Sequence, residues 1–194
     1  PGCVREGIPT MMELHALPDK NWDALAPVVN ESAFLGLVTL TDALKAEYVS
    51  AGVPEEKVFV WPDAVDIDAY AGGERHAFRR PLDMPMDKKI AVYSGHFYKD
   101  RGVDQVIQAM KDLPEWELWC VGGWDEHVAK HQALAEVAGV TNVRFTGHVD
   151  QSLVPRYLQA ADALVLSYTL DAFPALWGSP LKLFEYLAAE RPIV

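Results

Sequence analysis

The sequence has few cysteines, few basic residues and no long apolar run. Its 194 residues include only two cysteines, Cys3 and Cys120, which are too few for a disulfide framework and indicate a reducing compartment. Seventeen lysines and arginines stand against 28 acidic residues, giving a net charge of -11. This balance argues against nucleic acid or an anionic membrane surface as the main partner. Apolar runs such as AFLGLVTL are too short to span a bilayer.

Several signatures of nucleotide and metal binding are also missing. There is no G-x-G-x-x-G fingerprint, which disfavours a nicotinamide-dependent dehydrogenase, and no Walker loop with its G-K-S/T. Histidine, cysteine, aspartate and glutamate nowhere show the spacing of a metal site, so we expect no metal and no other cofactor. No signal peptide is visible, and Pro1 and the apolar run at Val194 lead us to expect a piece of a longer protein.

What is present is half hydrophobic, as in ordinary globular proteins, and its segment order predicts an α/β fold. In the second part of the chain, apolar segments alternate with amphipathic ones, which predicts a Rossmann-like parallel sheet with helices on both faces. The strands are expected at 88–95, 116–123, 142–147 and 162–168, and the helices at 102–113, 126–139, 151–161 and 180–190.

The first part of the chain predicts a portion of a second Rossmann-like domain. Its strands are expected at 10–15, 34–40 and 56–62, and its helices at 20–33 and 41–52. Segment 63–87 has turn residues, mixed charge and no clean period, so we expect a linker there. The predicted domains are residues 1–66 and 67–194, the second being truncated at its C-terminal end.

Ligands of a parallel sheet bind beyond the carboxyl ends of its strands, so four loops are candidates for a functional site: SGHFYKDRG, VGGWDEH, TGHVDQ and SYTLDAFPALWGSP. In the last of them, Ser179 suits a helix N-cap and Pro180 a first helical turn, leaving the amides of Leu181 and Lys182 free. Free amides, the helix dipole and a lysine together predict an anion site. Glu185 lies one turn further on the same face, where it could hold a hydroxylated ring. The alternative is an N-capped surface helix with an exposed Lys–Glu pair.

The loop SGHFYKDRG, after the first strand of the second domain, points to the same chemistry. Gly95 and Gly102 allow close approach of the backbone to a ligand. His96 and Arg101 are two candidate cations at the crevice that Lys182 also faces. Two cationic loops on one rim favour an anion site over a loop with incidental basic residues.

Several blocks, in order, resemble the donor-binding domain of GT-B glycosyltransferases of family four. They are KKIAVYSGHFYKDRGVDQVIQAM, WELWCVGG, NVRFTGHV, AADALVLSY and SPLKLFEYLAAERPIV. The upstream run VTLTDALKAEYVSAGVPEEKVFVWPDAVDIDAY resembles the end of the acceptor-side domain, and MELH resembles that domain's histidine-bearing strand. The likeness covers nearly the whole chain and depends on the order and spacing of the blocks.

The resemblance implies that a donor diphosphate is held at Gly95, His96, Arg101 and Gly102. The family has a Gly-Arg…Lys-Gly loop there, so histidine replaces the arginine and arginine replaces the lysine. Arg101 keeps a permanent charge and adds a forked geometry, whereas a histidine is only partly charged at neutral pH.

The family's paired-glutamate motif implies that Glu185 binds the ribose hydroxyls. The first glutamate should fall eight residues earlier, where this sequence has Trp177. Its role near the transferred sugar is then absent, recast, or passed to a residue such as Asp171, so Trp177 and Asp171 are candidate sugar contacts. Relatives with a Ser-Pro-Leu-Lys start, as at 179–182, often lack that glutamate, so we interpret Trp177 as a subgroup trait.

The resemblance implies further contacts from the other loops. His15 matches a histidine that faces the donor sugar; taken alone, a histidine at a strand end is more commonly structural. Two further loops are expected to bind the base, largely through the backbone. One contains Gly122 and Gly123, and the other runs from Gly147 to Val149.

The resemblance implies a retaining, hexosyltransferase-type transfer from a UDP- or GDP-sugar to an unknown acceptor hydroxyl. Arg101, Lys182 and His15 would be the catalytic residues, without a metal. The partners would be the nucleotide-sugar donor and a carbohydrate or lipid-linked acceptor, but no nucleic acid. The expected location is cytoplasmic. Peripheral contact with the inner face of the membrane, made by segments outside this chain, is left open. The alternatives are a nucleotide-sugar 2-epimerase of GT-B architecture and a non-catalytic nucleotide-sugar binding module.

Overall fold

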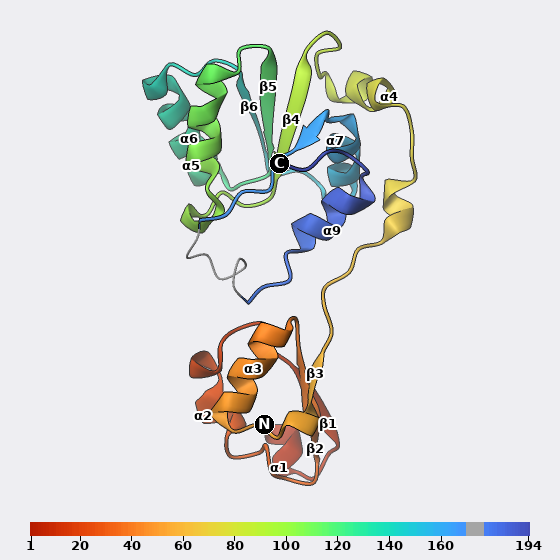
Figure 1. Cartoon of the computed structure of the whole chain (residues 1–194), viewed down its shortest axis with the longest axis vertical. Coiled ribbons are helices and arrows are strands. Elements are labelled where there is room, and N and C mark those ends of the chain that lie inside the picture. Colours follow the sequence, from red (N-terminus) through yellow and green to blue (C-terminus); the bar gives the residue numbers. More distant parts are fainter. Residues whose placement is uncertain (170–176) are drawn as a thin grey trace. The chain divides into compact units, whose positions relative to one another are not determined.

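The computed structural model describes residues 1–169 and 177–194, which form two compact units (Figure 1). The first unit contains Pro1–Asp63 and residues 177–180; the second contains residues 64–169 and Leu181–Val194. The division falls three residues before the expected one. Residues 64–66 belong with the second unit because they line a pocket there together with Pro155 and Gln159.

A three-stranded parallel sheet organises the first unit. Its strands are β1 (Thr10–Glu13), β2 (Phe34–Thr39) and β3 (Val58–Val60), paired in that order. The helices are α1 (Gly2–Arg5), α2 (Trp22–Leu25) and α3 (Asp42–Ala51), with 3-10 turns at Pro18–Lys20 and Glu55–Lys57. Parallel pairing of consecutive strands is what the alternation of segments predicts.

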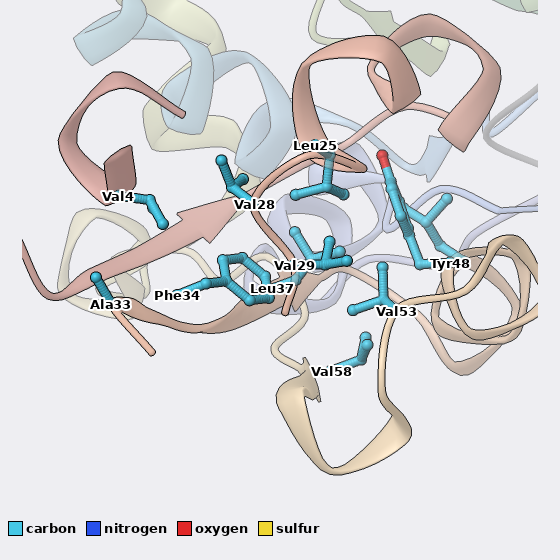
Figure 2. Close-up of a cluster of buried hydrophobic side chains, with 11 residues drawn as sticks. Val4, Leu25, Val28, Val29, Ala33, Phe34, Leu37, Tyr48, Val53 and Val58 are labelled. Carbon is cyan, nitrogen blue, oxygen red and sulfur yellow. The ribbon is translucent and has the colours of Figure 1, made fainter. Parts of the chain in front are cut away.

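Apolar side chains from strands and helices meet in one core of this unit (Figure 2). Phe34 and Leu37 of β2 lie in the same cluster as Leu25 of α2 and Tyr48 of α3. The Tyr48 hydroxyl donates a hydrogen bond to the Ala16 carbonyl at 2.8 Å, so the polar end of this buried ring has a partner.

The two predicted helices of the first unit have different outcomes. The one at 41–52 is confirmed: Thr41 Oγ1 accepts a hydrogen bond from the Leu44 amide at 3.1 Å, and Gly52 closes the helix at φ 116°. The one at 20–33 is wrong, because only Trp22–Leu25 are helical before a series of turns. Pro27 has no N–H to continue the helical hydrogen bonds.

The second unit contains a four-stranded parallel sheet in the order β6-β5-β4-β7. The strands are β4 (Lys89–Ser94), β5 (Trp116–Val121), β6 (Val143–Gly147) and β7 (Ala163–Leu164). The helices are α4 (Arg75–Arg79), α5 (Val103–Ala109), α6 (Asp125–Ala138), α7 (Val154–Ala160) and α9 (Leu181–Ala188). Short 3-10 turns are at Ile67–Tyr70, Arg80–Leu82, Lys99–Arg101, Met110–Asp112 and Gln151–Leu153.

Helices cover both faces of this sheet (Figure 1). On one face, α5 and α6 pack through Ile107 and Ala135 into a cluster with Leu118 of β5. On the other face, α7 and α9 contribute Leu158 and Tyr186 to a second cluster. The predicted α/β class, a Rossmann-like parallel sheet with helices on both faces, is confirmed.

The strand expected at 162–168 is shorter than predicted. Its ladder with β4 covers only Ala163 and Leu164. Beyond it, the Leu166 amide bonds the Val194 carbonyl at 2.8 Å, and the Val194 amide bonds the Leu164 carbonyl at 2.9 Å. The last residues of the chain therefore lie beside β7, in a single parallel bridge between Leu164 and Ile193.

A buried arginine attaches the segment expected to be a linker to the second sheet. Arg79 is 1% exposed; its Nε donates to the Ala160 carbonyl at 2.9 Å and its Nη2 to Asp162 Oδ2 at 2.6 Å. Asp162 also accepts from the Ile90 amide at 2.6 Å and pairs with Arg75. Helix α4 is thus held to the start of β4 and β7 by a hydrogen-bonded ion pair.

Candidate functional site

The loops after β4 and β5 approach each other closely at two glycines. Gly95 has φ 118° and Gly122 has φ 109°, both in the region that favours glycine. A Cβ on Gly122 would lie 2.7 Å from the Gly95 carbonyl oxygen, and a Cβ on Gly95 would lie 3.3 Å from Cε of Lys182. Glycine at both positions therefore allows the loops to meet beside Lys182.

A pocket of about 320 Å³ opens at this edge of the sheet, within the second unit. Six of the residues that line it were predicted from the sequence: Gly95, His96, Arg101, Leu181, Lys182 and Glu185. Four lining residues were not predicted: Ser94, Gln151, Val154 and Tyr168. Of these, Ser94, Gln151 and Tyr168 lie in or at the end of the four candidate loops. That position in the sequence is the signal from which they could have been predicted.

Lys182 is partly buried among aromatic rings. Its Nζ lies 3.8 Å from the centroid of the Tyr93 ring and 5.7 Å from that of Tyr168. Burial, and then the charge of Arg101, lower the pKa of Lys182 to about 7, while Glu185 and Asp100 partly oppose this shift. Near neutral pH the amine is therefore only partly charged, and a bound anion would favour its charged form.

Arg101 ends the 3-10 turn Lys99–Arg101 and lies against Tyr168, with its guanidinium carbon 5.1 Å from the ring centroid. Its carbonyl accepts a hydrogen bond from Ser167 Oγ at 2.7 Å, which fixes the turn. An Asp100 carboxylate oxygen lies 3.8 Å from its Nη1, and within the described ranges this buried nitrogen has no hydrogen-bond partner. Arg101 lines the pocket, so its guanidinium contributes a permanent positive charge there. Gly102 follows directly and caps α5.

His96 forms part of a series of stacked rings that sequence reasoning missed. Its centroid lies 5.1 Å from that of Tyr98 and 5.6 Å from that of Trp124, and Trp124 stacks on His148 at 5.7 Å. Burial, then the charges of Arg101, His127, His148 and Lys182, lower the pKa of His96. At neutral pH the His96 ring is therefore largely uncharged, and the positive charge of the pocket comes mainly from Arg101 and Lys182.

Glu185 lies one helical turn after Lys182 on α9. Its Oε1 accepts a hydrogen bond from Gln151 Nε2 at 3.3 Å. Burial raises the pKa of its carboxyl, and hydrogen bonds from Gln151 and Tyr70 and the charge of Lys182 oppose the shift. Lys182 and Glu185 both line the pocket, so they are not the exposed surface pair of the alternative interpretation.

The residues just before α9 group with the first unit. Ser179 Oγ accepts a hydrogen bond from the Asp63 amide at 3.0 Å, and α9 begins at Leu181, so Pro180 precedes the helix instead of lying in its first turn. The Trp177 carbonyl accepts from Thr41 Oγ1 at 2.9 Å. Asp171, the other candidate sugar contact, lies outside the described residues.

The remaining predicted residues have partners of their own. His15 Nε2 lies 2.7 Å from Glu13 Oε1 at the end of β1, in the first unit, and its role toward a sugar stays a prediction. The Gly122 amide bonds the Gly147 carbonyl at 3.0 Å, which joins the two predicted base-binding loops. A Cβ on Gly123 would lie 2.6 Å from the Phe97 ring, and Val149 packs against the core that contains Tyr186.

Two kinds of feature are absent from the described ranges, 1–169 and 177–194. None of their helices is long and apolar enough to cross a membrane. Nor do these ranges contain a group of three or more histidine, cysteine, aspartate or glutamate side chains placed to hold a metal ion.

Comparison with known proteins identifies the family. The sequence profile of glycosyl transferases group 1 matches residues 74–194. The putative colanic acid biosynthesis glycosyl transferase WcaI of Escherichia coli (strain K12) is 27% identical over 154 residues, covering 77% of this chain and 37% of that protein.

Two solved structures share the fold over nearly the whole chain. Anabaena HepE in complex with UDP has a TM-score of 0.79 at 16% identity, covering 98% of this chain and 54% of that one. Sucrose-phosphate synthase from Thermosynechococcus elongatus has a TM-score of 0.74 at 18% identity, covering 99% and 51%. The chain thus spans about half, or less, of the length of these proteins. The resemblance to GT-B glycosyltransferases is confirmed, and the chain belongs to the glycosyl transferases group 1 family.

Proposed function

We propose that the second unit binds a nucleoside-diphosphate sugar and stabilises the diphosphate as it leaves. The protein to which the chain belongs would then transfer a hexose to an acceptor hydroxyl with retention of configuration, as the resemblance implies. The observation that carries this proposal is the meeting of Arg101, Lys182 and Glu185 in one pocket at the carboxyl edge of the sheet.

The two cations suit a group whose negative charge grows during the reaction. When the bond between sugar and phosphate breaks, charge accumulates on the diphosphate, and donors aimed at that charge lower the barrier. Arg101 brings a permanent charge to the pocket, and Lys182 gains charge as the anion enters. We infer that these side chains take the place of a metal ion and that the transfer needs no cofactor.

Glu185 suits the nucleoside part of the donor. A carboxylate accepts several hydrogen bonds, so it can receive both hydroxyls of a ribose. The solved structure of Anabaena HepE contains UDP, which makes UDP the first nucleotide to test, with GDP the alternative. The name of WcaI refers to colanic acid, which supports a carbohydrate or lipid-linked acceptor, and the two free cysteines fit the proposed cytoplasmic location.

Calorimetry with UDP, GDP and ADP tests the donor-binding proposal directly on this chain. We expect saturable binding of at least one of them, and no binding at millimolar concentration would refute the proposal. A transfer assay of the longer protein with a chelator present then tests metal independence. Product analysis separates transfer from 2-epimerisation.

Trp177, at the position of the first glutamate, favours a second candidate function: a module that binds nucleotide-sugars without transferring them. This module would bind the donor as tightly as an enzyme does. The longer protein would then yield no glycosylated product with any acceptor while still binding the nucleotide-sugar, and that result separates the two functions.

A further inference from the structure

Glu185 lies between two pockets of the second unit. On one side is the candidate donor pocket of about 320 Å³, and on the other is a larger pocket of about 730 Å³. The two pockets share Gln151, Leu181 and Glu185. The carboxylate can therefore be held from the larger pocket while it faces a ligand in the smaller one.

Tyr70, at the end of the 3-10 turn Ile67–Tyr70, lines the larger pocket together with Glu185 and does not line the smaller one. The residue is 8% exposed and packs in the core with Leu158 and Tyr186. Its carbonyl accepts a hydrogen bond from the buried Gln159 Nε2 at 2.9 Å, which fixes the backbone. Burial, and then the nearby Glu185 carboxylate, raise the pKa of the Tyr70 hydroxyl, so the two groups are close neighbours in this pocket.

We propose that Tyr70, together with Gln151, positions the Glu185 carboxylate to accept two neighbouring hydroxyls of a ribose. This inference rests on the proposed function, in which Glu185 binds the nucleoside. Tyr70 does not line the donor pocket, so it acts through Glu185 and is a positioning residue.

The number of acceptor positions on a carboxylate supports this role. Its two oxygens accept about four hydrogen bonds in all. Gln151 occupies one position, the Tyr70 hydroxyl would occupy a second from the larger pocket, and the positions that remain match a vicinal diol. A carboxylate held by two donors has less freedom to lose on binding, so a ligand with both hydroxyls gains more than one without them.

The test compares three ligands that differ only in the nucleoside: UDP, 2′,3′-dideoxy-UDP and inorganic pyrophosphate. Tyr70→Phe removes one hydroxyl and keeps the ring in the core. We expect UDP affinity to fall about three- to tenfold, as for the loss of one hydrogen bond. The affinities of dideoxy-UDP and pyrophosphate should stay within twofold, because neither ligand has the diol.

Tyr157→Phe is the matched control. Tyr157 is a half-buried tyrosine of α7 whose ring lies 6.4 Å from that of Trp119, and it lines neither pocket. Its variant should bind all three ligands like the unsubstituted chain. A melting temperature for each variant checks that the fold is kept.

Three outcomes would overturn the inference. If Tyr70→Phe weakens all three ligands equally, its role is structural. If it changes no affinity while Glu185→Gln selectively weakens UDP, Glu185 needs no positioning, and the proposed function survives alone. If the unsubstituted, folded chain binds none of the three ligands, the proposed function fails and this inference fails with it.

Discussion

The amine of Lys182 lies over the ring of Tyr93, 3.8 Å from the ring centroid. Tyr93 is near the end of β4. Arg101, on the neighbouring turn, adds a like charge and contributes to the lowered pKa of this lysine. An aromatic face stabilises a cation, but it does not neutralise it as a carboxylate would. The arrangement therefore leaves positive charge for an incoming anion to balance.

This relationship predicts that donor binding is coupled to proton uptake. With a pKa of about 7 in the free chain, Lys182 is mostly neutral at pH 8 to 9 and mostly charged below pH 6. A bound diphosphate raises that pKa, so binding above pH 7 requires a proton. Since the phosphates of UDP-glucose keep their charge over this range, its affinity should fall as pH rises from 7 to 9, by at most about tenfold per pH unit.

Calorimetry in two buffers of different ionisation enthalpy measures the proton directly. The apparent binding enthalpy should differ between the buffers at pH 8 and converge below pH 6. Lys182→Met is the matched control, because it keeps an apolar stem and removes the titrating group. An affinity that stays constant from pH 7 to 9 in the unsubstituted chain would contradict the assignment.

Loss of Lys182 and loss of Glu185 should have different signatures. Lys182→Ala removes a charged contact worth about 1.5–3 kcal/mol, so affinities for UDP and pyrophosphate should both fall about ten- to a hundredfold. Glu185→Gln should weaken UDP and leave pyrophosphate within twofold, since pyrophosphate has no ribose. In the longer protein, Lys182→Ala should also lower turnover, because charge grows on the phosphate in the transition state.

Isothermal titration with both ligands separates these signatures. If each variant bound UDP within twofold of the unsubstituted chain, Lys182 and Glu185 would have no role in donor binding and the site assignment would be wrong.

Local patterns predicted much of the fold, and contacts distant in sequence explain most of what they missed. Thr41 and Gly52 mark their helix because capping depends on nearby residues alone. Pro27 interrupts the helix that the pattern of residues 20–33 predicts, because proline has no N–H for the helical hydrogen bond. Arg79 lies in a segment without periodicity, and its partner Asp162 is 83 residues away. That separation hides the pair from any local pattern.

The residues of the candidate site also divide into those that local patterns predict and those that depend on contacts distant in sequence. Gly95, Arg101 and Lys182 could be predicted because the carboxyl ends of parallel strands gather at one edge. Tyr70 could not be predicted as a partner of Glu185, since it lies in an irregular segment 115 residues before that carboxylate. The partial charge of Lys182 likewise depends on burial that only the packed structure reveals.

Arg79→Met should destabilise the second unit. Arg79 makes hydrogen bonds to the carbonyls of Ala160, Pro85 and Lys88 and to Asp162, and these acceptors would lose a buried partner. Breaking a buried ion pair from one side costs about 3–5 kcal/mol, and the remaining pairing of Asp162 with Arg75 places the expected loss near the lower end. Urea unfolding followed by circular dichroism measures the change in the free energy of unfolding.

The exposed Arg80, next in sequence, provides the control for that experiment. Arg80→Met should change the free energy of unfolding by less than about 0.5 kcal/mol, as is usual for surface substitutions. Equal effects of the two variants would show that the hydrogen bonds of Arg79 contribute little.

Gly122→Ala should impair the site as well as the fold. A Cβ at this position would lie 2.7 Å from the Gly95 carbonyl oxygen, so the Gly95 loop must shift, and Gly95 adjoins Lys182. Gly139 is a matched control: it also has a positive φ, of 69°, but a Cβ there would meet nothing within 4 Å. Gly139→Ala should cost about 1 kcal/mol of stability from backbone strain alone and leave UDP affinity unchanged. Gly122→Ala should cost more stability and lower UDP affinity at least fivefold; equal UDP affinity in the two variants would show that the approach of the two loops does not shape the pocket.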